Sequence, residues 1–244
     1  MSAVTMLGAY VEQAPPAGVR DTVACLWRQR VEVDRQVIVP DGCVDVVWFD
    51  SGRLVVAGAD TAARVERLSP GETVHGVRLR PGAAAAALGR DVSELLDRQV
   101  EPAEVWGEHG ADVAVALAVA GGDAVHGLML GRLVGVRPDP VVQHAAGLLA
   151  EPGARVGEVA RTIGVSDRQL QRRCVATVGY GPKMLARVLR LQRLRSLGVG
   201  DDDLDLADRA LRAGYASQAH MGDEVRRLTG TTPVRFLEDR AAVA

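Results

Sequence analysis

One spacing pattern occurs twice in the C-terminal part of this 244-residue chain. Each copy has an alanine four residues before a glycine, a serine soon after that glycine, and a second glycine three residues before a proline. The copies lie about fifty residues apart and comprise Ala160, Gly164, Ser166, Gly179 and Pro182, then Ala210, Gly214, Ser217, Gly230 and Pro233. Alanine lets two helices approach, glycine allows a tight turn, and serine caps the next helix. The pattern predicts two helix-turn-helix units, whose second helices are typical readers of the DNA major groove.

The charge of the chain is unevenly distributed. Its formal net charge is −2, yet residues 155–195 contain ten basic side chains and only two acidic ones. Because phosphate neutralisation is local, this excess favours a surface that faces DNA. The alternative interpretation is a solvated face in an arginine-rich chain.

The composition, 48% hydrophobic and 25% charged, favours a folded globular protein of one large or two ordinary domains. Residues 111–130 are apolar but interrupted by charges and glycines, so they do not predict a membrane span. No secretory signal is expected at the N-terminus. Cys25, Cys43 and Cys174 are scattered, which is typical of a reducing cytoplasm rather than of a disulfide or zinc framework. We therefore expect a cytoplasmic, nucleoid-associated protein with no membrane partner, no metal and no cofactor.

The first part of the chain predicts strands and the rest predicts helices, an α+β fold. Short runs rich in valine, leucine and tryptophan alternate with turn formers at 23–33, 36–39, 43–49, 53–58, 62–68 and 74–80, which indicates a small barrel or sandwich. Helices are expected at 83–88, 91–99 and 112–133, the last interrupted near Gly121. Two prolines, Pro138 and Pro140, mark the best boundary. We predict a β-rich sensor domain over 1–110, a helical connector over 111–137 that could dimerise, and an all-helical DNA-binding domain over 138–244.

The first reading helix is expected over residues 167–178, behind a supporting helix at 155–163. Leu170, Cys174 and Val178 recur every four residues and form its buried stripe, which leaves Arg168, Gln171 and Arg172 on the opposite face. Arginine and glutamine match guanine and adenine edges in the major groove. Arg173 lies off that line and is predicted to contact phosphate. Solvation of the helix, with Asp167 as an ion-pair partner, is the alternative.

The second reading helix, starting near Ser217, is a poorer reading surface. Met221 and Val225 are predicted to face inward. Its outward residues are predicted to be Gln218, Ala219, Gly222 and Asp223, flanked by His220. Glycine weakens a helix and aspartate repels phosphate, although it can accept from cytosine. A long amphipathic helix beginning at Pro182 is expected to join the two units and to fix the distance between their reading helices.

These residues resemble the AraC/XylS family of bacterial transcription regulators. The resemblance covers residues 140–238 and is carried by 159–166, 168–172, 179–183, 214–221 and 228–233. It implies two helix-turn-helix units that bind promoter DNA, and activation through contacts with RNA polymerase. At the matching positions the DNA readers are Arg168, Gln171 and Arg172, then Gln218, Ala219, Gly222 and Asp223. Asp223 departs from the family, in which a basic residue is common there.

The N-terminal half is similar to the sensor region of one subgroup, on residues 40–48, 57–60 and 76–82. The resemblance implies a cupin-like β domain that binds a small-molecule effector and dimerises through an adjoining helix. Trp27, Trp48 and Cys43 are candidate ligand-binding residues, although core packing of the tryptophans and a buried, unreactive thiol are the favoured alternatives.

The chain is thus predicted to be an effector-responsive, sequence-specific promoter-binding regulator and not an enzyme. Two alternatives stay open. One is an architectural DNA-binding dimer without a ligand. The other is an enzyme or metal sensor that uses Cys43, Asp45 and His75.

Overall fold

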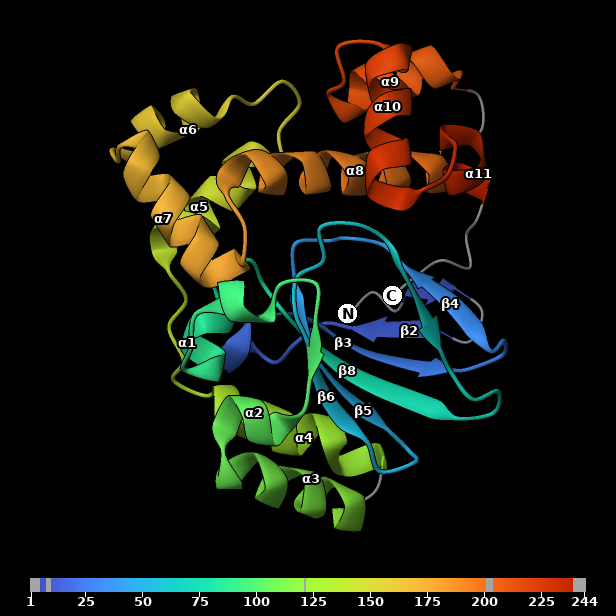
Figure 1. Cartoon of the computed structure of the whole chain (residues 1–244), viewed down its shortest axis with the longest axis vertical. Coiled ribbons are helices and arrows are strands. Elements are labelled where there is room, and N and C mark those ends of the chain that lie inside the picture. The colour runs from blue at the N-terminus through green and yellow to red at the C-terminus, as the bar shows by residue number, and fades with distance from the viewer. Residues whose placement is uncertain (1–4, 8–9, 121, 201–203, 239–244) are drawn as a thin grey trace.

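The computed structural model describes residues 5–7, 10–120, 122–200 and 204–238. The N-terminal part contains a seven-stranded antiparallel sheet in the order β1-β2-β3-β8-β5-β6-β9, and a two-stranded sheet of β4 and β7 (Figure 1). The strands of the large sheet are β1 (Thr5–Leu7), β2 (Tyr10–Gln13), β3 (Val23–Arg30), β8 (Thr73–Leu79), β5 (Val44–Phe49), β6 (Leu54–Ala57) and β9 (Gln99–Val100); β4 is Arg35–Ile38 and β7 is Arg64–Arg67. The sequence predicted six of these nine strands and missed β1, β2 and β9.

The two sheets face each other across a partly polar interior. Side-chain hydrogen bonds cross between them, from Gln29 to Gln36 at 3.0 Å and from Gln99 to Glu66 at 2.9 Å. Within the described residues the edge strands β1 and β9 do not pair with one another, so the large sheet does not close on itself. Of the two predicted architectures, barrel and sandwich, the structure is an open sandwich. The outer face of the large sheet is apolar and supports the helices that follow.

Five helical segments connect the sheets to the C-terminal part. They are α1 (Ala84–Leu88), the 3-10 turn η2 (Val92–Leu95), α2 (Pro102–Trp106), α3 (Glu108–Ala120) and α4 (Gly122–Leu133). The helix predicted over 91–99 is wrong. The carboxylate of Asp91 accepts the N–H of Ser93 at 2.9 Å and closes a single turn, and Asp97 then takes a positive φ of 56°. Residues 99 and 100 are free to pair with β6, which makes them a strand.

The C-terminal part is all helix, as predicted. Its elements are α5 (Pro140–Leu149), α6 (Val156–Ile163), α7 (Asp167–Val178), α8 (Pro182–Gly200), α9 (Leu206–Ala213), α10 (Gln218–Thr229) and α11 (Pro233–Glu238). Asp139 caps α5 by accepting from the N–H groups of Val141 and Val142, directly after the proline-bounded boundary. The prediction of a β-rich N-terminal part followed by a helical C-terminal part is confirmed. None of the described helices is long and apolar enough to cross a bilayer.

The two parts pack against each other along α8, which lies across one end of the large sheet (Figure 1). The side-chain amide of Gln192 on α8 donates to the carbonyl of Pro40 at 2.6 Å. Val39 packs in one apolar cluster with Leu191 and Leu194. The N–H of Ala63 donates to the carbonyl of Leu228, at the end of α10, at 2.7 Å. The β-rich part therefore touches the connecting helix and the second helix-turn-helix unit directly.

Candidate nucleic-acid interface

The start of α7 is fixed by a reciprocal cap. The Gln169 N–H donates to Ser166 Oγ at 3.2 Å, and the Ser166 N–H donates to Gln169 Oε1 at 2.9 Å. Gly164, with φ of +79°, ends α6 in the left-handed conformation that glycine tolerates best. Two otherwise free backbone donors are thereby satisfied, and the direction of α7 relative to α6 is set. The predicted capping role of Ser166 is confirmed.

The faces of α7 are those expected from the sequence. Leu170, Cys174 and Val178 are fully buried or nearly so. Arg168, Gln171 and Arg172 are exposed on the opposite side. Neither Arg168 nor Arg172 forms a hydrogen bond or ion pair with another residue that the structure describes. Both guanidinium groups are therefore available to a ligand outside the chain.

Gln171 and Arg173 have neighbours that the sequence did not indicate. The amide of Gln171 lies against Gly181, where a Cβ atom would approach its nitrogen to 2.5 Å. Arg173 Nη1 lies 2.7 Å from Asp139 Oδ2, so the residue predicted to contact phosphate already has an acidic partner within the chain. This ion pair ties the middle of α7 to the start of α5.

The second reading helix, α10, is capped in a similar way, since the His220 N–H donates to Ser217 Oγ at 3.1 Å. Met221 and Val225 are fully buried, as predicted. The predicted outward residues Gln218, Ala219 and Asp223 are exposed, whereas Gly222, predicted on the same face, is buried. Arg226 Nη1 lies 3.5 Å from where a Cβ of Gly222 would stand, so the long side chain one turn later covers this position.

A buried carboxylate, missed at the sequence level, anchors α10 to α8. Glu224 is 4% exposed, and its Oε2 lies 3.2 Å from Arg187 Nε while its Oε1 lies 3.5 Å from Arg190 Nη1. His220 Nε2 lies 3.7 Å from the same carboxylate. The available signal in the sequence was a pair of arginines three residues apart on α8, together with a glutamate on α10. The orientation of the second reading helix therefore depends on charge pairing as well as on apolar packing.

His220 is less free than its predicted flanking role implied. Its Nδ1 accepts the N–H of Ala216 at 3.2 Å, and its ring stands edge-on to Tyr215 with centroids 5.5 Å apart. The guanidinium of Arg190 lies over the Tyr215 ring, 5.2 Å from its centre. The imidazole thus helps to fix the turn before α10.

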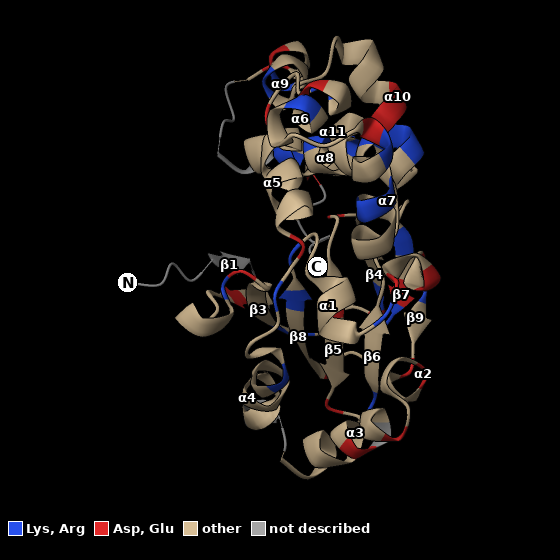
Figure 2. Cartoon of the chain, turned by 90° about the vertical axis from the view of Figure 1, so that its left-hand side faces the viewer, with Lys and Arg blue, Asp and Glu red and all other residues tan. Residues whose placement is uncertain are grey.

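Basic side chains are distributed differently on the two reading helices. Figure 2 shows Lys and Arg concentrated on α7 and the adjoining helices, whereas α10 carries acidic and basic residues together. Arg226 and Asp223 on α10 lie 3.9 Å apart and partly offset each other in charge. The first unit therefore offers the more strongly basic surface.

The candidate ligand residues of the β-rich part do not converge on one site. In the register of the large sheet, Trp27 lies opposite Gly76, whereas Trp48 lies opposite His75. Neighbouring residues of a strand point to opposite faces. Trp27 accordingly faces the interior between the sheets, and Trp48 is buried on the outer face. Both tryptophans fill core positions on either side of one sheet.

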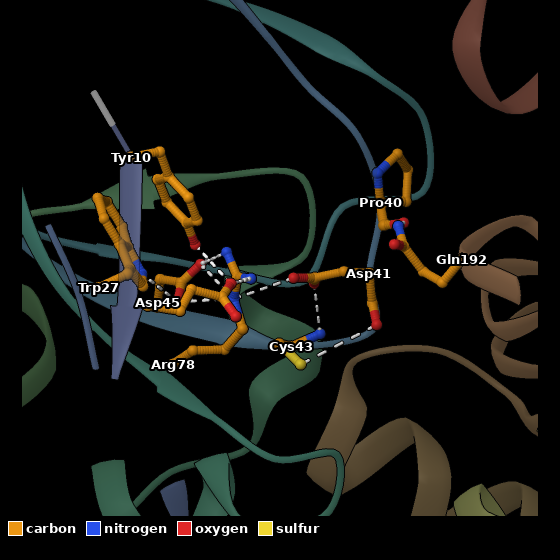
Figure 3. Close-up of polar contacts among 9 residues, drawn as sticks. Tyr10, Trp27, Pro40, Asp41, Cys43, Asp45, Arg78 and Gln192 are labelled. Carbon is orange, nitrogen blue, oxygen red and sulfur yellow. Dashed lines mark hydrogen bonds and ion pairs between the residues drawn. The ribbon is translucent and has the colours of Figure 1, made fainter. Parts of the chain in front are cut away.

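A buried charge cluster occupies the interior beside Trp27 (Figure 3). Arg78 Nε lies 3.2 Å from Asp45 Oδ1 and 3.1 Å from Asp41 Oδ2, and Trp27 Nε1 donates to Asp45 at 3.2 Å. Arg78 joins strand β5 to the loop before it, because Asp41 lies in that loop. A buried, paired guanidinium of this kind holds its neighbours in one arrangement.

The alternative site of Cys43, Asp45 and His75 is not assembled. Asp45 faces the interior and His75 faces the outer side of the same sheet. The Cys43 N–H donates to Asp41 Oδ1 at 2.8 Å, and burial raises the pKa of the Cys43 thiol well above its ordinary value. In the part of the chain that the structure describes, no three histidine, cysteine or acidic side chains are grouped as metal ligands. The enzyme or metal-sensor alternative requires these three residues to meet in one site, and the structure does not bring them together.

Two families match separate parts of the chain. Residues 159–239 match a helix-turn-helix domain, and residues 11–101 match a domain of unknown function, DUF6597. The helix-turn-helix domain is of the AraC type, so the predicted resemblance of the C-terminal part is confirmed. The N-terminal match carries no assigned function, and the predicted sensor role stays a prediction.

A curated relative, the probable bifunctional transcriptional activator/DNA repair enzyme AlkA of Mycobacterium tuberculosis, is 38% identical over 110 residues. These cover 44% of this chain, and the chain spans 22% of the length of that relative. Among solved structures, ToxT from Vibrio cholerae is 12% identical, with 91% of this chain and 98% of that chain covered and a TM-score of 0.48. A regulator with an AraC-type DNA-binding domain from Chromobacterium violaceum is 26% identical, with 43% and 96% covered and a TM-score of 0.39.

Proposed function

We propose that this protein is a transcription regulator that binds promoter DNA through α7 and, with less discrimination, through α10. The observation that carries the proposal is the exposed row of Arg168, Gln171 and Arg172 on a capped helix of an AraC-type domain. Arginine donates two parallel hydrogen bonds to guanine, whereas a glutamine amide donates to N7 of adenine and accepts from its N6 amino group. Arg168 lies one helical turn before Gln171 and Arg172, a spacing that suits contacts with adjacent base pairs in the major groove.

The connecting helix supports the use of both units on one duplex. α8 contains 19 residues, which corresponds to about 28 Å of helix. Reading helices that enter successive major grooves on one side of DNA stand about 34 Å apart. A rigid spacer of this length, with one unit packed near each end, is compatible with that requirement.

The second unit is proposed to contribute mainly backbone contacts. Gln218 is its best candidate for a base contact, with Ala219 beside it. Asp223 is exposed and partly offset by Arg226, and Gly222 offers no side chain. Ser166 and Arg173 support the first unit through the cap and through the ion pair to Asp139, and we propose that phosphate contacts near them are secondary.

The β-rich part, over residues 1–110, is proposed to act as an effector-binding domain, joined by a connector over 111–137 to the DNA-binding domain over 138–244. A small-molecule effector would shift the population of DNA-binding states by binding one of them better. Activation through contacts with RNA polymerase is proposed on the same basis. The repair activity named for the mycobacterial relative is not proposed for this chain.

A homodimer through the connector is also proposed. Val115 and Val119 on α3 are 64% and 84% exposed, and Leu128 on α4 is 42% exposed. The first two lie one turn apart and face away from the core residues Val113 and Leu117. Val119→Glu is expected to shift the chain from dimer to monomer in sedimentation velocity, because a charge would be buried in an apolar contact. An unchanged sedimentation coefficient would contradict this interface.

Genome-wide footprinting with purified protein tests the DNA-binding proposal. Arg172→Ala is expected to weaken binding to preferred sites by about 1–3 kcal/mol while general DNA affinity is nearly kept. Arg67→Ala on β7 is the matched control, since it removes the same charge from an exposed position remote from α7. Equal loss on every DNA would mean that Arg172 contacts phosphate only. Binding without any sequence preference in the unchanged chain would favour the architectural alternative.

A further inference from the structure

An apolar pocket of about 280 Å³ lies between the outer face of the large sheet and the connector helices. Its walls include Val77 and Leu79 of β8, Leu88 of α1, Trp106 of α2, Val113 of α3 and Met129 of α4. It is separate from the interior between the two sheets, where Trp27 and Asp45 lie. α2, α3 and α4 lie at the end of the molecule remote from α8 (Figure 1).

One charged side chain lines this pocket. Arg132, in the last turn of α4, is exposed and forms no hydrogen bond or ion pair with any other described residue. No acidic residue lies among the lining residues. A carboxylate at this position would gain a charge-assisted pair with a planar guanidinium, which recognises two oxygens at once.

We propose that this pocket binds a small apolar carboxylate, whose hydrocarbon body fills the cavity and whose carboxylate pairs with Arg132. A dry apolar cavity of about 150 Å³ holds benzene, so the present volume suits a body of about eleven non-hydrogen atoms. Apolar walls with one polar group at the edge are typical of sites for such ligands. Binding itself does not depend on the proposed function; its regulatory consequence does.

Two helices that line the pocket, α4 and α1, are linked to the first reading helix through Asp139. α4 ends at Leu133, six residues before Asp139, which caps α5 and pairs with Arg173 of α7. The N–H of Asp139 also donates to the carbonyl of Gly82 at 2.9 Å, just before α1. A ligand that draws α1 and α4 together would therefore act on the residue that holds α7 against α5.

Calorimetric titration of the full chain with 4-phenylbutyrate tests the site, and 4-phenylbutan-1-ol supplies the same body without the charge. The acid is expected to bind at least tenfold more tightly than the alcohol. Arg132→Gln should weaken the acid about tenfold and leave the alcohol unchanged. Arg67→Gln, which removes an exposed charge elsewhere, should change neither. Ala87→Leu places extra atoms in the pocket and should weaken both ligands.

Three results would overturn the site: no saturable binding of 4-phenylbutyrate at millimolar concentration, equal binding of acid and alcohol, or binding that Arg132→Gln and Ala87→Leu leave intact. DNA affinity measured with and without the acid tests the consequence. A change of about fivefold or more is expected in the unchanged chain and none in Arg132→Gln. Unchanged DNA affinity with ligand bound would overturn the route through Asp139. A chain that binds no DNA at all would contradict the proposed function and leave the titration result standing.

Discussion

At the scale of single residues, the buried carboxylate of Asp60 makes the stability of the chain depend on pH. Asp60 is 8% exposed, in the loop that leads to β7, and its carboxylate lies 3.1 Å from Arg64 Nε. Burial outweighs this pairing and raises the pKa of Asp60 to about 6. The loop also contacts α10, through the hydrogen bond from Ala63 to Leu228.

The raised pKa of Asp60 predicts a loss of stability as the pH rises. Between about pH 4 and pH 6 the folded chain binds a proton at Asp60 that the unfolded chain releases, so the free energy of unfolding falls with rising pH in that window. The expected loss is about 1–3 kcal/mol. Urea unfolding at several pH values should show this slope in the unchanged chain and a flatter profile in Asp60→Asn. Asp34→Asn, at an exposed aspartate, should keep the slope; a slope unaffected by Asp60→Asn would contradict the assignment.

At the scale of elements, the sequence predicted the first helix-turn-helix unit closely because its signals are local. The serine cap, the glycine turn and the four-residue spacing of Leu170, Cys174 and Val178 each act within one or two helical turns. The second unit was predicted less well. Glu224 is buried by its ion pairs with Arg187 and Arg190 of α8, which no local pattern of α10 encodes.

The β-rich part shows the same limit. Short apolar runs predicted six strands, but β9 forms only because residues 99–100 meet β6, and composition there suggested a helix. The separation of Asp45 from His75 follows from sheet register, which sequence spacing does not give across different strands. The pocket at Arg132 was likewise beyond sequence analysis, because two strands and four helices that lie far apart in the sequence supply its walls.

The contact between α8 and α10 makes a prediction at this scale. Glu224→Gln removes the carboxylate charge and leaves the half-buried Arg187 and Arg190 without their partner, at an expected cost of about 1–3 kcal/mol. Asp223→Asn, the exposed neighbour, should cost little. DNase footprints should show protection lost in the half of the site bound by α10 and kept in the half bound by α7. Similar effects of the two substitutions would mean that the buried charge does not position α10.

At the scale of the whole molecule, the loop before β5 joins the interior of the β-rich part to α8. Asp41 pairs with the buried Arg78, and the carbonyl of Pro40 accepts from Gln192 (Figure 3). Gly42 follows Asp41 directly, with φ of +85°, and a Cβ there would stand 3.1 Å from Leu185 Cδ1 and 3.6 Å from the Tyr180 hydroxyl. The closeness of the two parts at this point requires the absence of a side chain.

Gly42→Ala therefore strains both the backbone and the contact between the two parts. Gly52 provides a matched control, because its φ is +95° and no atom lies within 4 Å of its Cβ position. Gly52→Ala is expected to cost about 1–2 kcal/mol from the left-handed backbone alone. Gly42→Ala should lower the free energy of unfolding by about 1–2 kcal/mol more, because Leu185 on α8 must move to make room for the added methyl group. Calorimetry should show this as a midpoint lower by roughly 2–4 °C for each additional kcal/mol in a chain of this size.

The shape of the unfolding transition then distinguishes backbone strain alone from a weakened contact between the two parts. A continuous apolar core runs from the large sheet to α8, so the unchanged chain is expected to unfold in one transition. If Gly42→Ala loosens that junction, the β-rich part and the helical part should begin to unfold separately, whereas Gly52→Ala should lower one undivided transition. Equal midpoints and equal transition shapes for the two variants would mean that the contact between the loop before β5 and α8 does not stabilise the junction. Coupling between the two parts would then depend on Asp139 instead.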